Sequence, residues 1–394
     1  MGNNYQNWRC QLTNIMKVID SGFVYKGIVG STYDDKSIRR THICTSYDNT
    51  LYVSFRRGTD HESIDGHPVV MASTDEGVTW ELRYNGYGHG ELEAIPGQVM
   101  SLSIHEIKPG ILMGTSLWID HSDPSLPFMN PSTSGLLPEK IFHVLSTDGA
   151  RNWSKQKIMT SYPHVATSPC ANPVLRLSNG KLAQPYETHK EWQDTTPLKP
   201  MAFLRLSPDN GQTWPDWIQV AGDPKNIRYY WDQRIAVDIK TGLLIGMFWT
   251  HHSKERLDLD VHIAWGSKDA SKWTNPIPTG LPGQHCQPVI LPNQTVIAIY
   301  SDRVKPGISA SISHDFGKTW DRDKDLLLYT SSVGLEPGVG SNLDIQGQWQ
   351  SMVQYRFGHP RAILLPSGKI LAVWYAGDDH VKKVHWAKID PELV

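Results

Sequence analysis

The chain of 394 residues lacks an excess of charge of either sign and contains few cysteines. Its 38 basic and 40 acidic side chains give a formal net charge of −2, without the basic excess that nucleic-acid-binding proteins carry. No apolar run approaches the roughly 20 residues of a membrane helix. The four cysteines form no Cys-x-x-Cys pair, which argues against a zinc site and a disulfide framework and favours buried reduced thiols. We therefore expect no nucleic-acid partner, no membrane partner, no metal and no cofactor.

The amino-terminal residues are polar and hold no apolar core of the kind that secretory signal peptides have. The sequence leaves open a cytoplasmic location, secretion after removal of a leader, and the oligomeric state. The adjacent His251 and His252 are not expected to share a metal ion, because neighbouring strand residues point to opposite faces.

Tryptophan, glycine and proline are abundant, at 15, 32 and 26 residues, and one short pattern recurs among them. The pattern Ser-x-Asp-x-Gly-x-Thr-Trp occurs in three full and two degenerate copies, which begin at Ser73, Ser207, Ser313, Ser146 and Ser267. Aspartate and serine side chains bind nearby backbone amides and glycine adopts left-handed conformations, so the pattern predicts a turn. A catalytic aspartate is not needed five times, and a repeat at this spacing is typical of propellers and arrays.

Six other segments each consist of an apolar strand, a tight turn and a second apolar strand, as expected for hairpins. They cover residues 42–55, 102–115, 173–186, 235–249, 288–300 and 362–375. Five are followed by the aspartate turn, and the sixth is followed by a strand at 383–389. Six four-stranded sheets around one axis explain this count. We predict an all-β fold, a single-domain six-bladed β-propeller over residues 1–394, in which a strand near residues 17–28 closes the last blade. No helix of substantial length is expected.

Charged side chains recur where the first strand of each blade lines the central channel. Alignment of the hairpins on their turns gives two levels of candidate binding residues, namely Arg39, Arg40, Asp232, His285 and His359, and then His42, Arg234 and Arg361. The ends of the second strands add Arg57, Glu187 and Tyr375, with Asp60 and Arg303 just beyond. Converging arginines, histidines and carboxylates suit an anionic or polyhydroxylated ligand. Three long insertions, at 118–140, 187–200 and 329–350, are expected to wall this pocket.

These features resemble the sialidase (neuraminidase) superfamily of six-bladed propellers with Asp-box or BNR repeats, over almost the whole chain. The segment Ile-Arg-Arg-Thr at 38–41 resembles the Phe-Arg-Ile-Pro of sialidases, which implies that Arg39 binds a carboxylate. Residues 55–61 resemble the loop that carries the family's acid/base aspartate, which implies that role for Asp60. The segments 358–368 and 374–377 are similar to uncharacterised sialidase-like bacterial proteins.

The resemblance leaves the other catalytic roles open between several residues. The family's glutamate corresponds to Asp232 or to Glu187. His359 stands where the family has its nucleophilic tyrosine, and Tyr355 and Tyr375 are the tyrosines nearby. The remaining arginines of the family's triad would come from Arg234, Arg303, Arg356 and Arg361.

The resemblance favours an exo-acting glycoside hydrolase of sialidase type that cleaves a terminal acidic sugar, such as sialic acid, from a glycan. Arginines would clamp the substrate carboxylate, Asp60 would act as general acid, and Tyr355 or Tyr375 would attack the anomeric carbon. One alternative is a polysaccharide lyase for uronic-acid glycans, with His42, His285 or His359 as the base. Another is a non-catalytic glycan-binding propeller whose surface Trp118, Trp192 and Trp249 stack on sugars.

Overall fold

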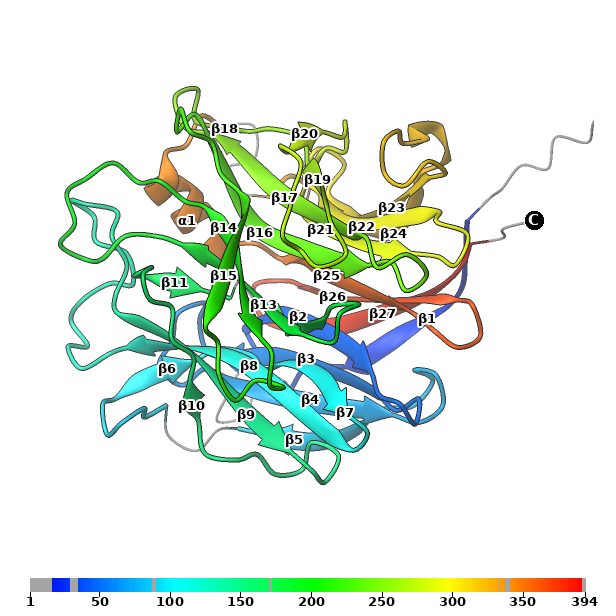
Figure 1. Ribbon diagram of the computed structural model, residues 1–394, viewed down its shortest axis with the longest axis horizontal. Coiled ribbons are helices and arrows are strands. Elements are labelled where there is room, and N and C mark those ends of the chain that lie inside the picture. The colour runs from blue at the N-terminus through cyan, green and yellow to red at the C-terminus, as the bar shows by residue number, and fades with distance from the viewer. Residues whose placement is uncertain are drawn as a thin grey trace, which may run out of the picture.

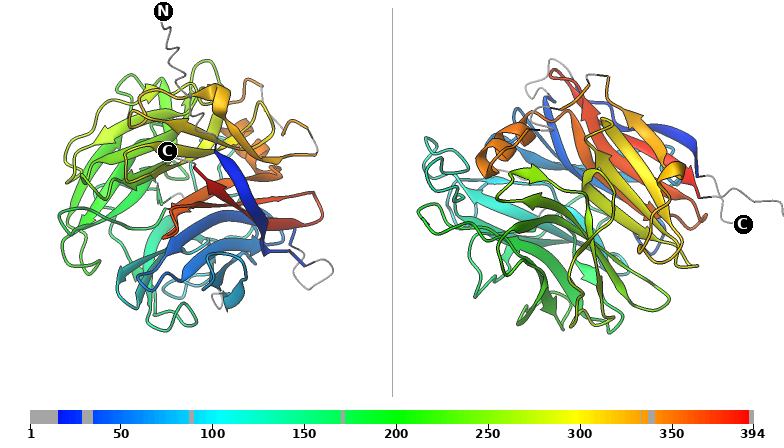
Figure 2. Two further views of the ribbon diagram at one scale, coloured as in Figure 1. Left: turned by 90° about the vertical axis from the view of Figure 1, so that its right-hand side faces the viewer. Right: turned by 90° about the horizontal axis from the view of Figure 1, so that it is seen from above.

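The computed structural model describes residues 16–28, 35–86, 90–169, 172–332, 334–336 and 341–391, and these residues are nearly all β-structure. Their strands form six sheets, the blades of a β-propeller (Figure 1). The left panel of Figure 2 looks down the central axis of the ring. The chain passes from blade to blade around this axis in sequence order. The fold class predicted from the repeats is confirmed.

The first three blades follow one another along the chain. Blade one contains β2 (Ser37–Thr45), β3 (Leu51–Gly58), β4 (His67–Ser73) and β5 (Glu81–Asn85). Blade two contains β6 (Gly97–Val99), β7 (Ser103–Lys108), β8 (Ile111–Asp120), β9 (Glu139–Ser146) and β10 (Lys157–Ile158). Blade three contains β11 (Thr167–Ser168), β12 (Leu175–Arg176), β13 (Leu182–Thr188), β14 (Ala202–Ser207) and β15 (Asp216–Ala221).

The remaining blades complete the ring. Blade four contains β16 (Arg228–Val237), β17 (Leu244–His252), β18 (Leu257–Asp258), β19 (His262–Gly266) and β20 (Ile277–Pro278). Blade five contains β21 (Gly283–Ile290), β22 (Val296–Asp302), β23 (Gly307–Ser313) and β24 (Leu326–Thr330). Blade six contains β25 (Phe357–Leu364), β26 (Ile370–Gly377), β27 (Lys382–Asp390) and, as its outer strand, β1 (Lys17–Tyr25).

The amino-terminal strand closes the ring as predicted. β1 pairs antiparallel with β27, from Lys17 opposite Asp390 to Tyr25 opposite Val384. In Figure 2 the two strands lie side by side in blue and red. This pairing covers the edge of β27, which an open last blade would expose.

The apolar core lies between the blades. Each of the six clusters of buried apolar residues joins two neighbouring blades, so that Val53 of β3 clusters with Val373 of β26, and Ala72 of β4 with Val144 of β9. Since apolar burial drives folding, these contacts fix each blade against the next.

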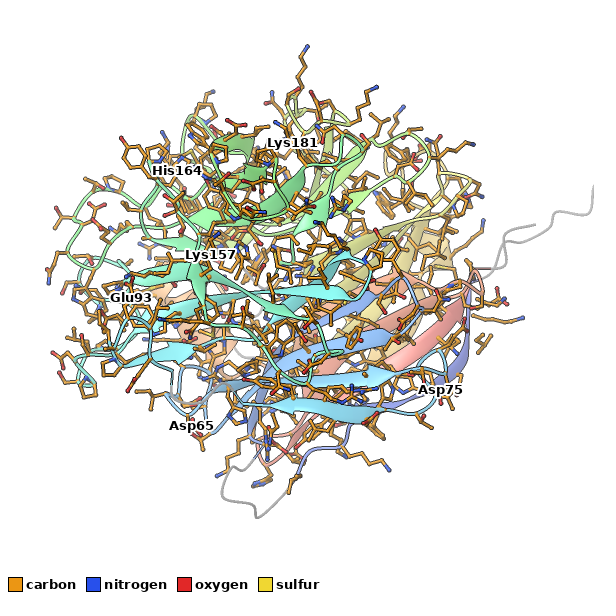
Figure 3. The ribbon with its side chains drawn as sticks, turned by 60° about the horizontal axis from the view of Figure 1, so that its bottom comes forward. Asp65, Asp75, Glu93, Lys157, His164 and Lys181 are labelled. Atoms are coloured by element: carbon orange, nitrogen blue, oxygen red, sulfur yellow. The ribbon has the colours of Figure 1, made fainter. Side chains whose placement is uncertain are left out.

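The repeated aspartate pattern forms a turn between the third and fourth strands of five blades. After β4, Ser73 Oγ donates to Asp75 Oδ1 at 2.7 Å and accepts from the backbone N of Gly77 at 2.9 Å. Burial opposes ionisation of Asp75, but the hydrogen bonds from Thr79 and Ser73 outweigh it and lower its pKa to about 2. Figure 3 shows Asp75 and Asp65 toward opposite ends of blade one. The repeated turns are structural. In blade one the turn lies at the opposite end of the blade from the β3–β4 loop, which contains Asp65.

Among the described residues, two short helices interrupt the β-structure, one of them in the last insertion, where the sequence predicts a loop. They are η1 (Arg322–Lys324) and α1 (Ile345–Val353). Asp344 caps α1 by accepting from the backbone N of Gly347 at 2.9 Å. A glycine in the first turn and four glutamine or serine residues hide the helical pattern in the sequence. In Figure 1, α1 and the loop after β8 extend from the same side of the propeller.

Cys44 and Cys286 are buried free thiols, whereas Cys10 and Cys170 lie outside the described residues. Across the described ranges, no helix is long and apolar enough to cross a membrane. No group of three or more His, Cys, Asp or Glu side chains in the same ranges could hold a metal ion.

Candidate active site

The inner strand of every blade has a β-bulge or a break, and these irregularities lie at equivalent positions along the six strands. In β2, β16, β21 and β25 a β-bulge places two residues opposite one residue of the neighbouring strand. The inner strands of blades two and three are broken there instead, between β6 and β7 and between β11 and β12. Bulges re-aim side chains and often lie beside active sites.

Three of the four bulges begin with a residue in the left-handed region. The φ angles of Arg40, Asp232 and His359 are 55°, 46° and 48°. Such conformations are unfavourable for residues other than glycine and persist where the surroundings enforce them. In blade five the bulge residue that lines the cavity is the second one, His285, and not the first, Gln284.

These four side chains line one cavity of about 100 Å³ at the centre of the ring. The other lining residues are His61, Leu117, Phe128, Met129, Leu136, Glu139, Ser168, Glu187, His189, Trp231, Trp249, Trp349 and Met352. Each of the three long insertions contributes to this wall, as the sequence predicts. The four predicted residues Arg40, Asp232, His285 and His359 therefore meet, and Glu187 joins them.

Asp232 is an ionised carboxylate in the cavity wall. Its Oδ2 lies 3.1 Å from Nε2 of His285, and its Oδ1 lies 3.5 Å from Nη2 of Arg234. Burial opposes its ionisation, but His285, Arg234 and Arg40 together hold its pKa well below the ordinary range. Glu187 accepts from the backbone N of Gln233 at 2.7 Å and so fixes the bulge that carries Asp232.

Glu139, the first residue of β9, is a cavity carboxyl that the sequence reasoning missed. Burial raises its pKa to about 8, with Arg40 opposing and Glu62 adding to the rise. Its Oε2 is shielded from solvent and has no hydrogen-bond partner among the described residues. It is therefore a neutral acid at pH 7 with a proton to donate. The sequence did predict that the 118–140 insertion walls the pocket, and the position of Glu139 near the end of this insertion could have identified it as a candidate.

Burial lowers the pKa of each histidine that lines the cavity. Burial lowers the pKa of His61 and of His189 to about 4, and burial with the nearby His285, Arg234, Arg40 and Arg39 places that of His359 well below its usual value. The rings of His285 and His359 lie 4.0 Å apart between centroids. Thr41 donates to the backbone O of His359, which ties the bulges of blades one and six together.

Arg40 differs from the other predicted arginines because it forms no hydrogen bond with any part of the chain that the structure describes. Arg39 donates to Tyr375 Oη at 2.7 Å and to the backbone O of Met352 at 3.2 Å. Arg303 donates to Gln284 Oε1 at 2.8 Å and to the backbone O of Phe357 at 3.1 Å. Arg40 is thus the arginine that the cavity offers to a ligand.

Asp60 and Arg57 lie outside the cavity. Asp60 is exposed on a rim groove, where its Oδ1 accepts from the backbone N of His61 at 2.6 Å. Arg57 forms a buried ion pair with Asp35. The loop that resembles the family's acid/base loop thus brings His61, and not Asp60, to the cavity.

Neither predicted tyrosine lines the cavity. The hydroxyl of Tyr375 is bound by Arg39, and that of Tyr355 accepts from Gln284 Nε2 at 3.2 Å. The Arg303 guanidinium covers the Tyr355 ring at 4.0 Å from its centroid. Both tyrosines are therefore held in a neighbouring buried cluster.

The second predicted level forms another polar cluster beside the cavity. Arg361 donates to Gln287 Oε1 at 2.9 Å and to Asn172 Oδ1 at 3.1 Å. Arg234 donates to the backbone O of Gln233 at 3.1 Å, and His42 Nδ1 accepts from the backbone N of Ile104 at 3.3 Å. The bulge between the two levels breaks the strand alternation on which the prediction relied.

Two of the three tryptophans proposed as a sugar-stacking surface, Trp118 and Trp249, are buried, whereas Trp192 is half-buried. Trp118 and Trp249 are each 1% exposed, and the indole Nε1 of Trp118 donates to the backbone O of Gly90. Trp249 faces the cavity beside Trp231, with ring centroids 5.4 Å apart. The aromatic surface of these two residues therefore faces the cavity.

Solved structures share this architecture at low sequence identity. A protein of unknown function from Dyadobacter fermentans is 18% identical, with a TM-score of 0.68 over 95% of this chain and 99% of its own. The Hadza microbial sialidase Hz136 is 14% identical, with a TM-score of 0.64 over 93% of this chain and 68% of its own. The α-L-arabinanase of Penicillium chrysogenum is 11% identical, with a TM-score of 0.63 over 96% of this chain and 99% of its own.

No family model matches the sequence, and no curated protein matches it either. At such identities the likeness concerns the fold, because one fold hosts many functions. The chain has the six-bladed β-propeller fold found in sialidases and in this arabinanase.

Proposed function

We propose that the protein is an exo-acting glycoside hydrolase that removes a terminal acidic sugar, sialic acid or a related sugar, from its substrate. Glu139 is the general acid that protonates the leaving oxygen, and Asp232 is the carboxylate that faces the anomeric carbon. Arg40 binds the carboxylate of the sugar.

The observation that carries the proposal is the contrast between two carboxyl groups in one cavity. Glu139 has a pKa of about 8 and is protonated at neutral pH, whereas the pKa of Asp232 is held well below its ordinary value. When the surroundings raise the pKa of one carboxyl group and lower that of another, the protonated group can act as the acid. The ionised group can then act as base or nucleophile. Glycosidases commonly use such a pair across the scissile bond.

Arg40 supplies the preference for an anion. A guanidinium matches a carboxylate with two parallel hydrogen bonds, and a neutral sugar offers no such partner. The sialidase-type tyrosine nucleophile is set aside, because Tyr355 and Tyr375 are bound elsewhere. Arg40 and Arg234 offset the repulsion between Asp232 and an anionic substrate.

The test is a panel of aryl glycosides of sialic acid, glucuronic acid and galacturonic acid, each beside a neutral analogue, with phenol release as the readout. We expect release from at least one acidic glycoside and a loss of about 10²-fold or more in Asp232→Asn. Asp216→Asn, an exposed change on β15, is the control. No release from any acidic glycoside, or full activity in Asp232→Asn, would contradict the proposal.

One observation favours a uronate lyase as the second candidate. His359 is a neutral imidazole in the cavity, and a neutral histidine can abstract the proton next to a carboxylate. A lyase releases an unsaturated sugar that absorbs in the near ultraviolet, whereas a hydrolase does not. Absorbance that rises with product would favour this candidate over hydrolysis.

A further inference from the structure

A second and larger hollow adjoins the central cavity. It is a groove of about 530 Å³ between helix α1 and the loop after β8. Its lining is mainly apolar and includes Ile64, Leu126, Pro127, Phe128, Met129 and Trp349. Ile64 is 55% exposed and Leu126 is 36% exposed, although large apolar side chains gain free energy when they are covered.

The groove and the cavity share one wall. Phe128, Met129 and Trp349 line both hollows. The rings of Phe128 and Trp349 stack with centroids 4.7 Å apart at 29°, and His61 packs edge-on against Trp349 at 5.4 Å. The two spaces therefore adjoin along these three side chains.

Two glutamates mark the point where the hollows meet. Glu139 lines the cavity and Glu62 lines the groove. They are close enough that the charge of Glu62 contributes to the raised pKa of Glu139. The proposed general acid thus lies within range of the charge of a residue that lines the groove.

We propose that the groove binds the leaving group of the substrate, and that this group is an apolar aryl or alkyl alcohol. The inference rests on the proposed function. In the reaction, the bond from the anomeric carbon to the glycosidic oxygen breaks, and Glu139 gives its proton to that oxygen. Water adds hydroxide to the anomeric carbon, and its remaining proton restores Glu139.

The polar groups of the groove do not suit a sugar as leaving group. Besides Glu62, they are His121, Gln346 and Gln350. The Gln346 amide already donates to the backbone O of Asn130 and of Pro131, which holds the loop after β8 to the helix. An apolar leaving group would cover the exposed Ile64 and Leu126, whereas a sugar would bury less apolar surface there.

Paired substrates test the preference. One acidic sugar is joined either to octyl alcohol or to the hydroxyl of a second sugar, and kcat/KM is measured for both. The double variant Ile64→Ser, Leu126→Ser should lower kcat/KM for the octyl glycoside about 10-fold and leave the sugar-linked substrate unchanged. The control Ile239→Ser, at a site that is 84% exposed on the β16–β17 turn, should change neither value. Equal losses on both substrates, or a wild-type preference for the sugar-linked one, would overturn the inference.

A binding measurement separates this inference from the proposed function. Isothermal titration calorimetry of Glu139→Gln with 4-methylumbelliferone, an apolar phenol, needs no turnover. We expect saturable binding that Ile64→Ser, Leu126→Ser weakens about 10-fold and Ile239→Ser does not. Such binding without hydrolysis of any glycoside would refute the proposed hydrolase and retain the apolar site. Hydrolysis without such binding would refute the apolar site alone.

Discussion

The imidazole Nε2 of His285 lies 3.1 Å from Oδ2 of Asp232, and the two residues belong to neighbouring blades. Both occupy β-bulges of inner strands, and a regular strand would direct them differently. The contact therefore connects a local irregularity of the backbone to the ionised state of Asp232.

Replacement of His285 by phenylalanine keeps a ring in place but removes the donor to Asp232. We expect kcat/KM to fall about 10²-fold and its acidic limb to move upward, toward an ordinary carboxyl pKa. The pH profile is measured on the acidic aryl glycoside, with His314→Phe, an exposed site, as the control. An unmoved acidic limb would show that His285 does not tune Asp232.

Replacement of Glu139 by glutamine removes the proposed acid. We expect a loss of about 10²–10⁴-fold for alkyl glycosides and a much smaller loss for dinitrophenyl glycosides, whose leaving oxygen needs no proton. Glu93→Gln, at an exposed residue paired with Lys140, is the matched control. Equal losses on both kinds of leaving group would assign Glu139 another role.

The raised pKa of Glu139 also predicts how stability depends on pH. Its pKa is about 8 in the folded protein against an ordinary 4.5, so the folded state binds the proton more tightly. The contribution of Glu139 to stability is therefore full below pH 4.5 and is lost as pH rises toward 8. At pH 8, Glu139→Gln should be more stable than the wild type by at least about 1.4 kcal/mol, the equivalent of one pKa unit. Urea unfolding of both proteins at pH 5 and pH 8 measures this, and a difference independent of pH would contradict it.

Replacement of Arg40 by methionine keeps much of the side-chain length and removes the charge. We expect kcat/KM for the acidic glycoside to fall about 10–100-fold, the range of a charge-assisted hydrogen bond, and that for a neutral analogue to change little. Arg151→Met, at a side chain that is 53% exposed, serves as the control. An equal loss of kcat/KM for the acidic glycoside and the neutral analogue would mean that Arg40 does not bind the substrate carboxylate.

Arg57 and Asp35 form a buried ion pair, with side chains 7% and 0% exposed. Asp35→Asn leaves the Arg57 charge without its partner and should lower the free energy of unfolding by about 3–5 kcal/mol. The pH profile of any remaining folded enzyme should stay unchanged, because neither residue lines the cavity. Urea unfolding and the activity profile together distinguish this structural role from the substrate-binding role predicted for Arg57.

The propeller fold could be predicted from the sequence, because the patterns that indicate it are local and repeat along the chain. The turn that begins at Ser73 recurs in five blades, and each hairpin pairs two apolar segments that are adjacent in the chain. The strand at Lys17–Tyr25 followed from counting blades. These features need no knowledge of how distant side chains meet.

The site was predicted only in part, because it depends on backbone irregularity and on loops. Alignment of the hairpins brought Arg40, Asp232 and His359 to one level, where the structure has its bulges. The same bulges invalidated the expectation for His42 and Arg361, which assumed strict alternation. Glu139 belongs to an insertion, and no strand pattern marks where an insertion folds back.

The most direct measurement is a crystal structure of Glu139→Gln with an intact acidic glycoside bound. We predict that the sugar carboxylate lies within hydrogen-bond distance of Arg40, with the anomeric carbon facing Asp232 and the glycosidic oxygen next to the amide of residue 139. A sugar bound in the central cavity with its carboxylate away from Arg40, or bound beside Tyr355 and Arg303 instead, would contradict the account.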